Sequence, residues 1–143
     1  MTTETLAIPK PGNPAIRVGR DGQPWIEGYR CGDCDTVVEA STLACRACAN
    51  RTAPEAFRAK EHGSVHTWSI VHRSYPGIET PFASVIVDLN GGPTLKGTLR
   101  NADLDKLEMG MPVRLVFDDA GGAKDKDGVP YVGFHFEPEG EQA

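Results

Sequence analysis

The sequence of 143 residues predicts a mainly β protein built in two parts. All four cysteines fall within residues 31–48, as two Cys-x-x-Cys pairs. Beyond Gly63, five runs rich in β-branched and aromatic residues are separated by turn residues, which is the pattern of short strands. These observations predict an N-terminal rubredoxin-like zinc ribbon followed by a five-stranded oligonucleotide/oligosaccharide-binding (OB) fold barrel.

The first 24 residues are expected to form a flexible N-terminal arm. They contain four prolines and show no helical period. Because proline lacks a backbone N–H and fixes its own φ angle, a stretch of this kind favours irregular structure.

Residues 25–61 are expected to form the zinc ribbon and its connector. The run Pro24–Arg30 predicts a short strand that leads into the first cysteine pair. Residues 35–44 span the distance between the two pairs. The run Pro54–Lys60 could supply either a single helical turn or a strand.

The candidate metal ligands are Cys31, Cys34, Cys45 and Cys48. Two Cys-x-x-Cys knuckles that face each other supply the four thiolates that Zn²⁺ prefers, so one structural zinc per chain is expected. Iron in a rubredoxin-like site has the same ligand geometry and stays open. A pair of disulfides is the other alternative, which a reducing cytosol disfavours. Four thiolates fill the coordination shell, so the metal should stabilise the fold and not react.

Residues 62–137 are expected to form the OB-fold domain, and residues 138–143 a C-terminal tail. Five runs predict its strands: Val65–His72, Phe82–Leu89, Thr94–Leu99, Pro112–Phe117 and Val129–Phe136. In the first run, strict alternation would put two sets of side chains on opposite faces. The sets are Val65, Thr67, Ser69 and Val71 on one face, and His66, Trp68, Ile70 and His72 on the other.

Between the third and fourth of these runs, residues 101–110 predict a short helix. Asn101 or Asp103 could cap it, Leu104 and Leu107 would share a face, and Gly110 would end it. Five strands with one short helix between the third and the fourth are the layout of an OB barrel.

No catalytic residue is predicted. The sequence has no Gly-x-Ser-x-Gly elbow, no His-Glu-x-x-His pair and no glycine-rich phosphate loop. His66 and His72 stand beside apolar neighbours, and we interpret them as structural. Trp25 and Tyr29 flank the first cysteine pair, where they could pack the ribbon onto the barrel or anchor a partner.

Charge and hydropathy disfavour two classes of partner. The formal net charge is −5 and the pI is near 5.3, whereas nucleic-acid binding depends on an excess of cationic side chains. No segment approaches the ~20 apolar residues of a transmembrane helix, and the N-terminus has no secretory pattern. A cytoplasmic protein that binds neither nucleic acid nor membrane is expected.

The two cysteine knuckles are followed by an expected barrel. Residues 63–71 begin this barrel, and residues 107–117 lead the chain back into it after the short helix. This combination resembles the DUF35 family. Members are rubredoxin-like zinc ribbon and OB-fold proteins associated with acyl-CoA metabolism. The resemblance covers roughly residues 25–137, and the four cysteines match the metal ligands of the family position by position.

The resemblance implies a non-catalytic accessory subunit of a thiolase-fold enzyme that acts on acyl-CoA thioesters. A CoA-linked steroid side-chain aldolase is the favoured complex, and a biosynthetic thiolase or a hydroxymethylglutaryl-CoA synthase is the alternative partner. The acyl-CoA would be shared with the partner, and Arg73 and Tyr75 in the first barrel loop are its expected contacts, although a solvated hairpin tip explains the same two residues. A nucleic-acid-binding module and an independent acyl-CoA-binding protein or enzyme are the remaining hypotheses.

Overall fold

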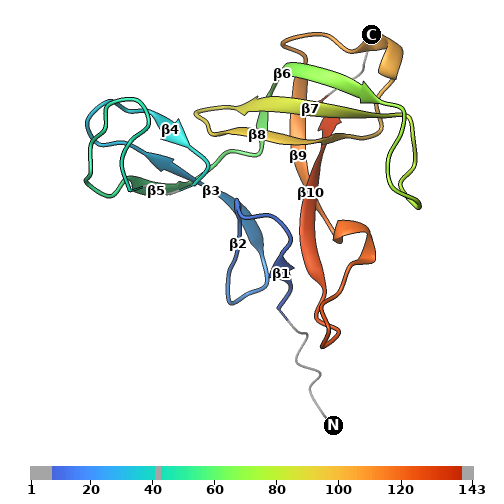
Figure 1. The fold of residues 1–143 in the computed structure, drawn as a ribbon, viewed down its shortest axis with the longest axis horizontal. Helices are drawn as coiled ribbons and strands as arrows, with labels where there is room; N and C mark the ends of the chain where they lie inside the picture. The colour runs from blue at the N-terminus through green and yellow to red at the C-terminus, as the bar shows by residue number, and fades with distance from the viewer. Residues whose placement is uncertain (1–7, 41–42, 140–143) are drawn as a thin grey trace.

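Strands dominate the computed structural model, which describes residues 8–40 and 43–139 (Figure 1). The described residues form a six-stranded sheet, a four-stranded sheet and two short 3-10 helices, without an α-helix. Some expected segments lie outside the described residues: residues 1–7 of the arm, residues 41–42 between the cysteine pairs, and residues 140–143 of the tail. The predicted mainly β fold is confirmed.

Five strands of the larger sheet close into a barrel. They are β6 (His62–Val71), β7 (Phe82–Leu89), β8 (Thr94–Leu99), β9 (Pro112–Asp118) and β10 (Tyr131–Pro138). Antiparallel pairing joins β6 to β7, β7 to β8, β10 to β9 and β9 to β6, while β8 and β10 pair in parallel. This closed circuit confirms the five-stranded OB fold predicted from the sequence.

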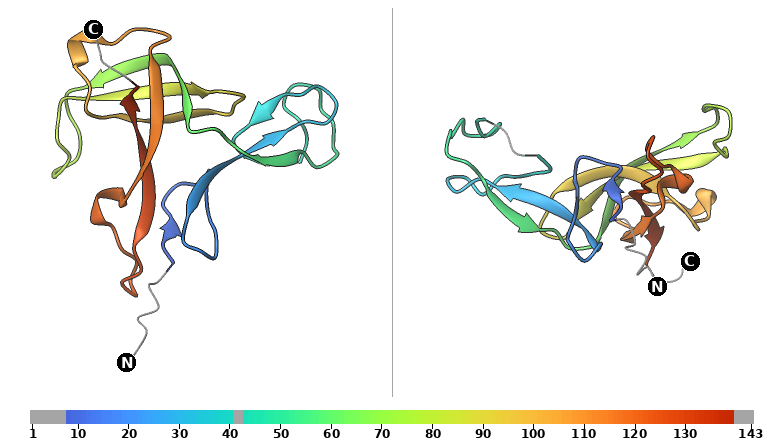
Figure 2. Two further views of the ribbon diagram at one scale, coloured as in Figure 1. Left: turned by 180° about the vertical axis from the view of Figure 1, so that it is seen from behind. Right: turned by 90° about the horizontal axis from the view of Figure 1, so that it is seen from below.

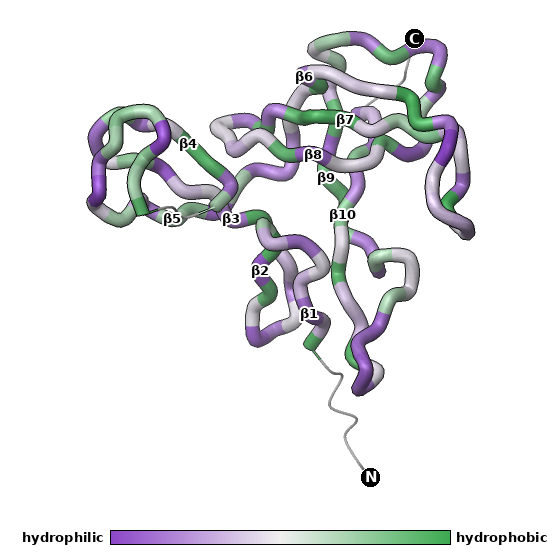
Figure 3. The backbone as a smooth tube through the Cα atoms, in the orientation of Figure 1, coloured by the Kyte–Doolittle hydropathy of each residue, from purple (hydrophilic) through white to green (hydrophobic). Residues whose placement is uncertain are grey.

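The barrel core is built from alternate residues of its strands. On β7 the buried positions are Ala83, Val85, Val87 and Leu89, and the positions between them are half-buried. The ring of Phe136 on β10 is completely buried, and it lies so close to Gly97 on β8 that a Cβ there would be 2.8 Å from Cε2 of Phe136. Hydropathy colouring shows a strongly hydrophobic stretch on β7 (Figure 3).

Strict alternation on β6 is wrong, because the strand contains a β-bulge. The pairing register with β7 shifts between Val65 and Thr67. Val65 is buried, and beyond the bulge Trp68 and Ile70 are the residues that pack against the core. A bulge adds one residue to one strand, which moves every later side chain to the other face. His66 therefore does not share a face with Trp68, and it is exposed.

The short helix between β8 and β9 is a single 3-10 turn, η1 (Leu104–Lys106). Of the two expected caps, Asp103 is the one used, since its Oδ1 accepts a hydrogen bond from the amide of Asp105 at 3.0 Å. Leu104 and Leu107 both pack against the core. The helix ends before Leu107 and not at Gly110, whose φ of +84° instead turns the chain toward β9.

Residues 10–18 differ from the flexible arm expected there. Strand β1 (Lys10–Pro11) pairs in parallel with β10, and β2 (Ile16–Val18) pairs antiparallel with β3 (Pro24–Arg30). Ile16 is 0% exposed and belongs to the main core. The prolines permit this because a two-residue edge strand needs few backbone N–H donors.

The ribbon is a small sheet beside the barrel. Its strands are β2, β3, β4 (Val37–Val38) and β5 (Glu55–Arg58), and β3 pairs with the other three. For residues 54–60 the sequence allowed a helical turn or a strand, and the structure forms the strand β5. Figure 2 shows the cysteine-bearing end of the ribbon extending to one side of the barrel. The turn between β7 and β8 touches it, with Gly92 against Val37 and Pro93 near Gly28.

Candidate metal centre

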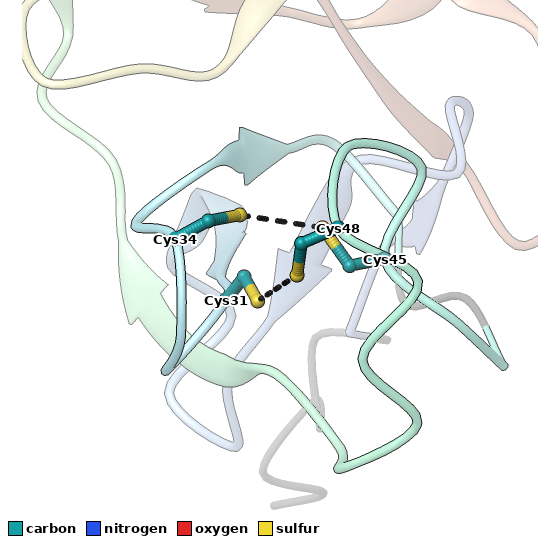
Figure 4. A group of neighbouring side chains, drawn as sticks. All are labelled: Cys31, Cys34, Cys45 and Cys48. Atoms are coloured by element: carbon teal, nitrogen blue, oxygen red, sulfur yellow. Dashed lines mark hydrogen bonds between the residues drawn. The ribbon is translucent and has the colours of Figure 1, made fainter.

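The first cysteine pair forms a tight knuckle after β3. The amide of Asp35 donates to the carbonyl of Cys31 at 3.1 Å, and the amide of Cys31 donates to the carbonyl of Thr36 at 2.9 Å. Asp35 has a φ of +60°, the left-handed conformation in which Asp and Asn are enriched among residues other than glycine. The bend aims the thiols of Cys31 and Cys34 toward the second pair (Figure 4).

The second pair repeats this geometry. The amide of Ala49 donates to the carbonyl of Cys45 at 2.8 Å, and the amide of Cys45 donates to the carbonyl of Asn50 at 2.8 Å. Ala49 has a φ of +65°, so the left-handed residue stands four positions after the first cysteine in both knuckles. The two Cys-x-x-Cys spacings therefore form two equivalent backbone loops.

The four sulfur atoms converge on one point. All of them lie within 4.8 Å of one another. The contacts between Cys31 and Cys48 and between Cys34 and Cys45 are both 3.6 Å (Figure 4). This is far beyond a disulfide bond of about 2.05 Å. It is close to the ~3.8 Å that separates sulfurs in a tetrahedral site with Zn–S bonds of about 2.3 Å.

The electrostatics of the cluster suit a cation. Amides of Cys34 and Asp33 donate to the Cys31 sulfur and lower its pKa to about 6, and those of Cys48 and Ala47 lower the pKa of Cys45. The amide of Asn50 also lowers the pKa of Cys48, but desolvation and the neighbouring thiols outweigh it and raise that pKa to about 12.

Four thiols at this separation resist ionising together, because like charges repel. A divalent cation would remove this conflict, so the donor set fits Zn²⁺ or another metal that prefers sulfur.

The structure brings the four cysteines together but keeps the other candidate residues apart from them. Arg73 and Tyr75 lie in the loop between β6 and β7, where residues 72–81 are all exposed and Tyr75 is 81% exposed. This loop is on the barrel, whereas the cysteines are at the far end of the ribbon (Figure 1).

Trp25 and Tyr29 do not pack the ribbon onto the barrel. Side chains alternate along β3, and the buried positions that face the barrel side are Ile26 and Gly28. Trp25 and Tyr29 lie on the opposite face, half-buried. The guanidinium of Arg58 lies over the Trp25 ring, with 5.6 Å from Cζ to the ring centroid.

Sequence reasoning missed a polar cluster around His135 on β10. His135 is buried, and its Nδ1 and Nε2 each lie 2.7 Å from a carboxylate oxygen, of Asp118 and Glu137 respectively. Arg114 donates to the other oxygen of Glu137 at 3.1 Å. The alternation of charged residues on β9 and β10 was the available signal. The cluster cross-links the two strands and leaves neither ring nitrogen free.

None of the helical segments in the described part of the chain has the length and apolarity that crossing a membrane requires. A ribbon of two cysteine knuckles joined to a closed five-stranded barrel defines the chain as a rubredoxin-like ribbon plus OB-fold protein.

Comparison with known proteins gives the family. A family model described as the C-terminal OB-fold domain of ChsH2 matches residues 58–118. A DUF35 domain-containing scaffold protein of Methanocaldococcus jannaschii is 31% identical over 113 residues, covering 78% of this chain and 79% of that protein. The chain belongs to the DUF35 family.

Two further proteins resemble the chain. A probable enoyl-CoA hydratase alpha subunit of Thermomonospora curvata is 28% identical over 123 residues, which are 80% of this chain but 38% of that protein. The solved structure of the Ltp2-ChsH2(DUF35) aldolase superposes with a TM-score of 0.63 at 26% identity, covering 80% of this chain and 84% of the matched chain.

Proposed function

We propose that this chain is a non-catalytic accessory subunit of a thiolase-fold enzyme that acts on acyl-CoA thioesters. The favoured complex is a CoA-linked steroid side-chain aldolase, which cleaves its substrate by a retro-aldol reaction. The observation that carries the proposal is the match to a chain of the Ltp2-ChsH2(DUF35) aldolase, which covers 80% of this chain. The scaffold protein among the relatives supports the same kind of role.

The buried histidine of the barrel is not available as a general base. A general base needs a ring nitrogen that can take a proton from a substrate. Both nitrogens of His135 face carboxylates, so its ring has no nitrogen left for this role. No buried side-chain nitrogen or oxygen of the described residues lacks a hydrogen-bond partner.

The cysteine cluster is proposed to hold one structural zinc. Cys31, Cys34, Cys45 and Cys48 would be the four ligands, and the bound metal would fix the two knuckles without activating water. Iron accepts the same four-thiolate ligand set. The ribbon would then present β3 and β5 as a rigid surface.

The barrel is proposed to contribute the loop of residues 72–81 to the acyl-CoA site. Arg73 could pair with a phosphate of CoA, and Tyr75 could stack on its adenine. Such a subunit acts by ordering the loops of its partner and excluding water from the partner's site. These effects raise a rate without a reacting group from this chain.

The experiment that tests this function is co-purification of the tagged chain from its native organism. The partner is identified by mass spectrometry, and acyl-CoA cleavage and condensation are assayed with and without the chain. A thiolase-fold partner whose activity depends on this chain supports the proposal, and the reaction found distinguishes an aldolase from a biosynthetic thiolase or a hydroxymethylglutaryl-CoA synthase. Turnover by the isolated chain would contradict it. Strongly salt-dependent binding of single-stranded nucleic acid, without such a partner, would favour the nucleic-acid module.

A further inference from the structure

The four-stranded sheet has two unlike faces. Register pairs Ile16 with Ile26, and both are 0% exposed on the face that joins the core. On the other face, Arg17 of β2 lies opposite Trp25 of β3, and Arg58 of β5 lies opposite Glu27 of β3. Tyr29 is the next residue of β3 on this face. We call this second set, Arg17, Trp25, Glu27, Tyr29 and Arg58, the Arg-aromatic face.

Three members of this face form a closed hydrogen-bond network. Arg17 donates from Nε to Glu27 Oε2 and from Nη2 to the Tyr29 hydroxyl, both at 3.0 Å. The Tyr29 hydroxyl donates to the same Glu27 oxygen at 2.6 Å. Arg17 also donates from Nη1 to the carbonyl of Pro14 at 2.7 Å. The network holds the Tyr29 ring in place and neutralises Glu27.

Arg58 stands outside this hydrogen-bond network. Its guanidinium lies over the Trp25 ring, with 5.6 Å from Cζ to the ring centroid, and the residue is exposed. Within the described residues its guanidinium forms no hydrogen bond or ion pair. A guanidinium that is positioned by an aromatic ring keeps its N–H edge available, and this edge matches a carboxylate through two parallel hydrogen bonds.

The charge of the Arg-aromatic face differs from that of the whole chain. Two arginines stand against one glutamate, which Arg17 already pairs, so the face carries a net positive charge. The formal net charge of the chain is −5. A local excess of positive charge on an acidic protein favours a partner surface of negative charge.

We propose that the Arg-aromatic face docks an acidic surface of the partner protein, with Arg58 forming a two-pronged pair with a partner carboxylate. This inference rests on the proposed function, because it needs a protein partner. Tryptophan, tyrosine and arginine are the residues that most often dominate the binding energy of protein interfaces. A face that crosses three neighbouring strands fits another protein, whereas small molecules bind in concave sites.

The test measures the dissociation constant of the complex between the full-length chain and its co-purified partner. Arg58→Glu is expected to weaken binding at least about tenfold, and Arg58→Lys, which keeps the charge but loses the planar fork, severalfold. The wild-type affinity should fall as salt rises, and that of Arg58→Glu should respond less. Arg100→Glu changes the net charge equally at an exposed position on the barrel, and it is the matched control.

Zinc content and melting temperature show whether each variant is folded. The proposal is overturned if Arg58→Glu binds the partner as the wild type does, or if Arg100→Glu weakens binding as much. Loss of CoA binding by Arg58→Glu with unchanged partner binding would overturn it as well. A partner without acyl-CoA activity would contradict the proposed function, while the comparison of Arg58→Glu with Arg100→Glu would still decide the docking face.

Discussion

Gly92, in the turn between β7 and β8, lies directly against Val37 of β4, and this contact joins the barrel to the ribbon. A Cβ at Gly92 would be 2.8 Å from Cγ1 of Val37, a separation that real Cβ atoms do not adopt. Close by, a Cβ at Gly28 would be 3.1 Å from Cδ of Pro93. The two parts of the molecule therefore meet at positions where a Cβ would displace a neighbouring side chain.

The first prediction is that Gly92→Ala destabilises the protein by about 2–3 kcal/mol. The substitution adds a clash with Val37 to the cost of a side chain at a φ of +78°. Urea unfolding followed by circular dichroism measures the change in the free energy of unfolding. Gly91→Ala is the control, because Gly91 has a φ of +83° with no atom near its Cβ, and it should cost about 1 kcal/mol. Equal costs would show that the contact with Val37 has no energetic weight.

The second prediction concerns the metal. Purified protein should contain about one zinc per chain, and Cys48→Ser should lose it, because three thiolates do not complete the shell. Amides around the two knuckles should then lose hydrogen-exchange protection while β6 to β10 keep theirs, because most residues of the shared core lie on the barrel strands. Elemental analysis and exchange mass spectrometry measure both effects.

Thr36→Ala is the control for the metal experiment. The Thr36 hydroxyl lies 3.0 Å from the Cys34 sulfur, yet it is not one of the four clustered ligands. The variant should keep its zinc. Full metal content in Cys48→Ser, or native disulfides in the wild type, would refute the four-thiolate site.

Local patterns predicted the parts of the structure that depend on neighbours in sequence. The two Cys-x-x-Cys spacings are sufficient to define both knuckles, since each closes within six residues, from Cys31 to Thr36 and from Cys45 to Asn50. Strand β7 was predicted with its bounds because alternation and β-branched residues agree there.

Features that depend on remote pairing were not predictable in this way. Lys10 pairs with Tyr131, more than a hundred residues away, so a proline-rich segment that reads as irregular becomes a strand. The bulge after Val65 could not be predicted, because the apolar residues of β6 are compatible with pairing to β7 both with and without the shift in register. To predict the Arg-aromatic face, the pairing of β3 with both β2 and β5 must be known, because its residues come from all three strands.

The third prediction is a pH dependence carried by Glu137. Hydrogen bonds from His135, and then from Arg114, hold its pKa below the ordinary 4.5. Because the pKa of this carboxyl is lower in the folded than in the unfolded state, the ionised form stabilises the fold. The stabilisation is complete above the pKa of the unfolded state, and it is lost as the pH falls through the pKa of the folded state. Glu137→Gln should therefore be less stable than the wild type at pH 7, and the difference should shrink below about pH 4.

Urea midpoints at pH 7, 4.5 and 3 test this third prediction. Glu79→Gln is the control, since Glu79 lies in the exposed loop of residues 72–81. Its pH curve should match that of the wild type. A Glu137→Gln curve that runs parallel to the wild-type curve at all three pH values would show that this carboxylate does not contribute to acid sensitivity.

The last prediction tests whether the proline-rich N-terminal segment is part of the folded core. Ile16 is 0% exposed between β3 and the barrel, so Ile16→Ala should destabilise the protein by about 2–4 kcal/mol through lost burial and a cavity. Ile8→Ala makes the same chemical change at a residue that is 47% exposed, and it should cost no more than about 0.5 kcal/mol. Unfolding free energies of the two variants decide the matter. If both substitutions cost equally little, residues 10–18 do not contribute to the cooperative core, and the flexible arm expected from the prolines is the better description.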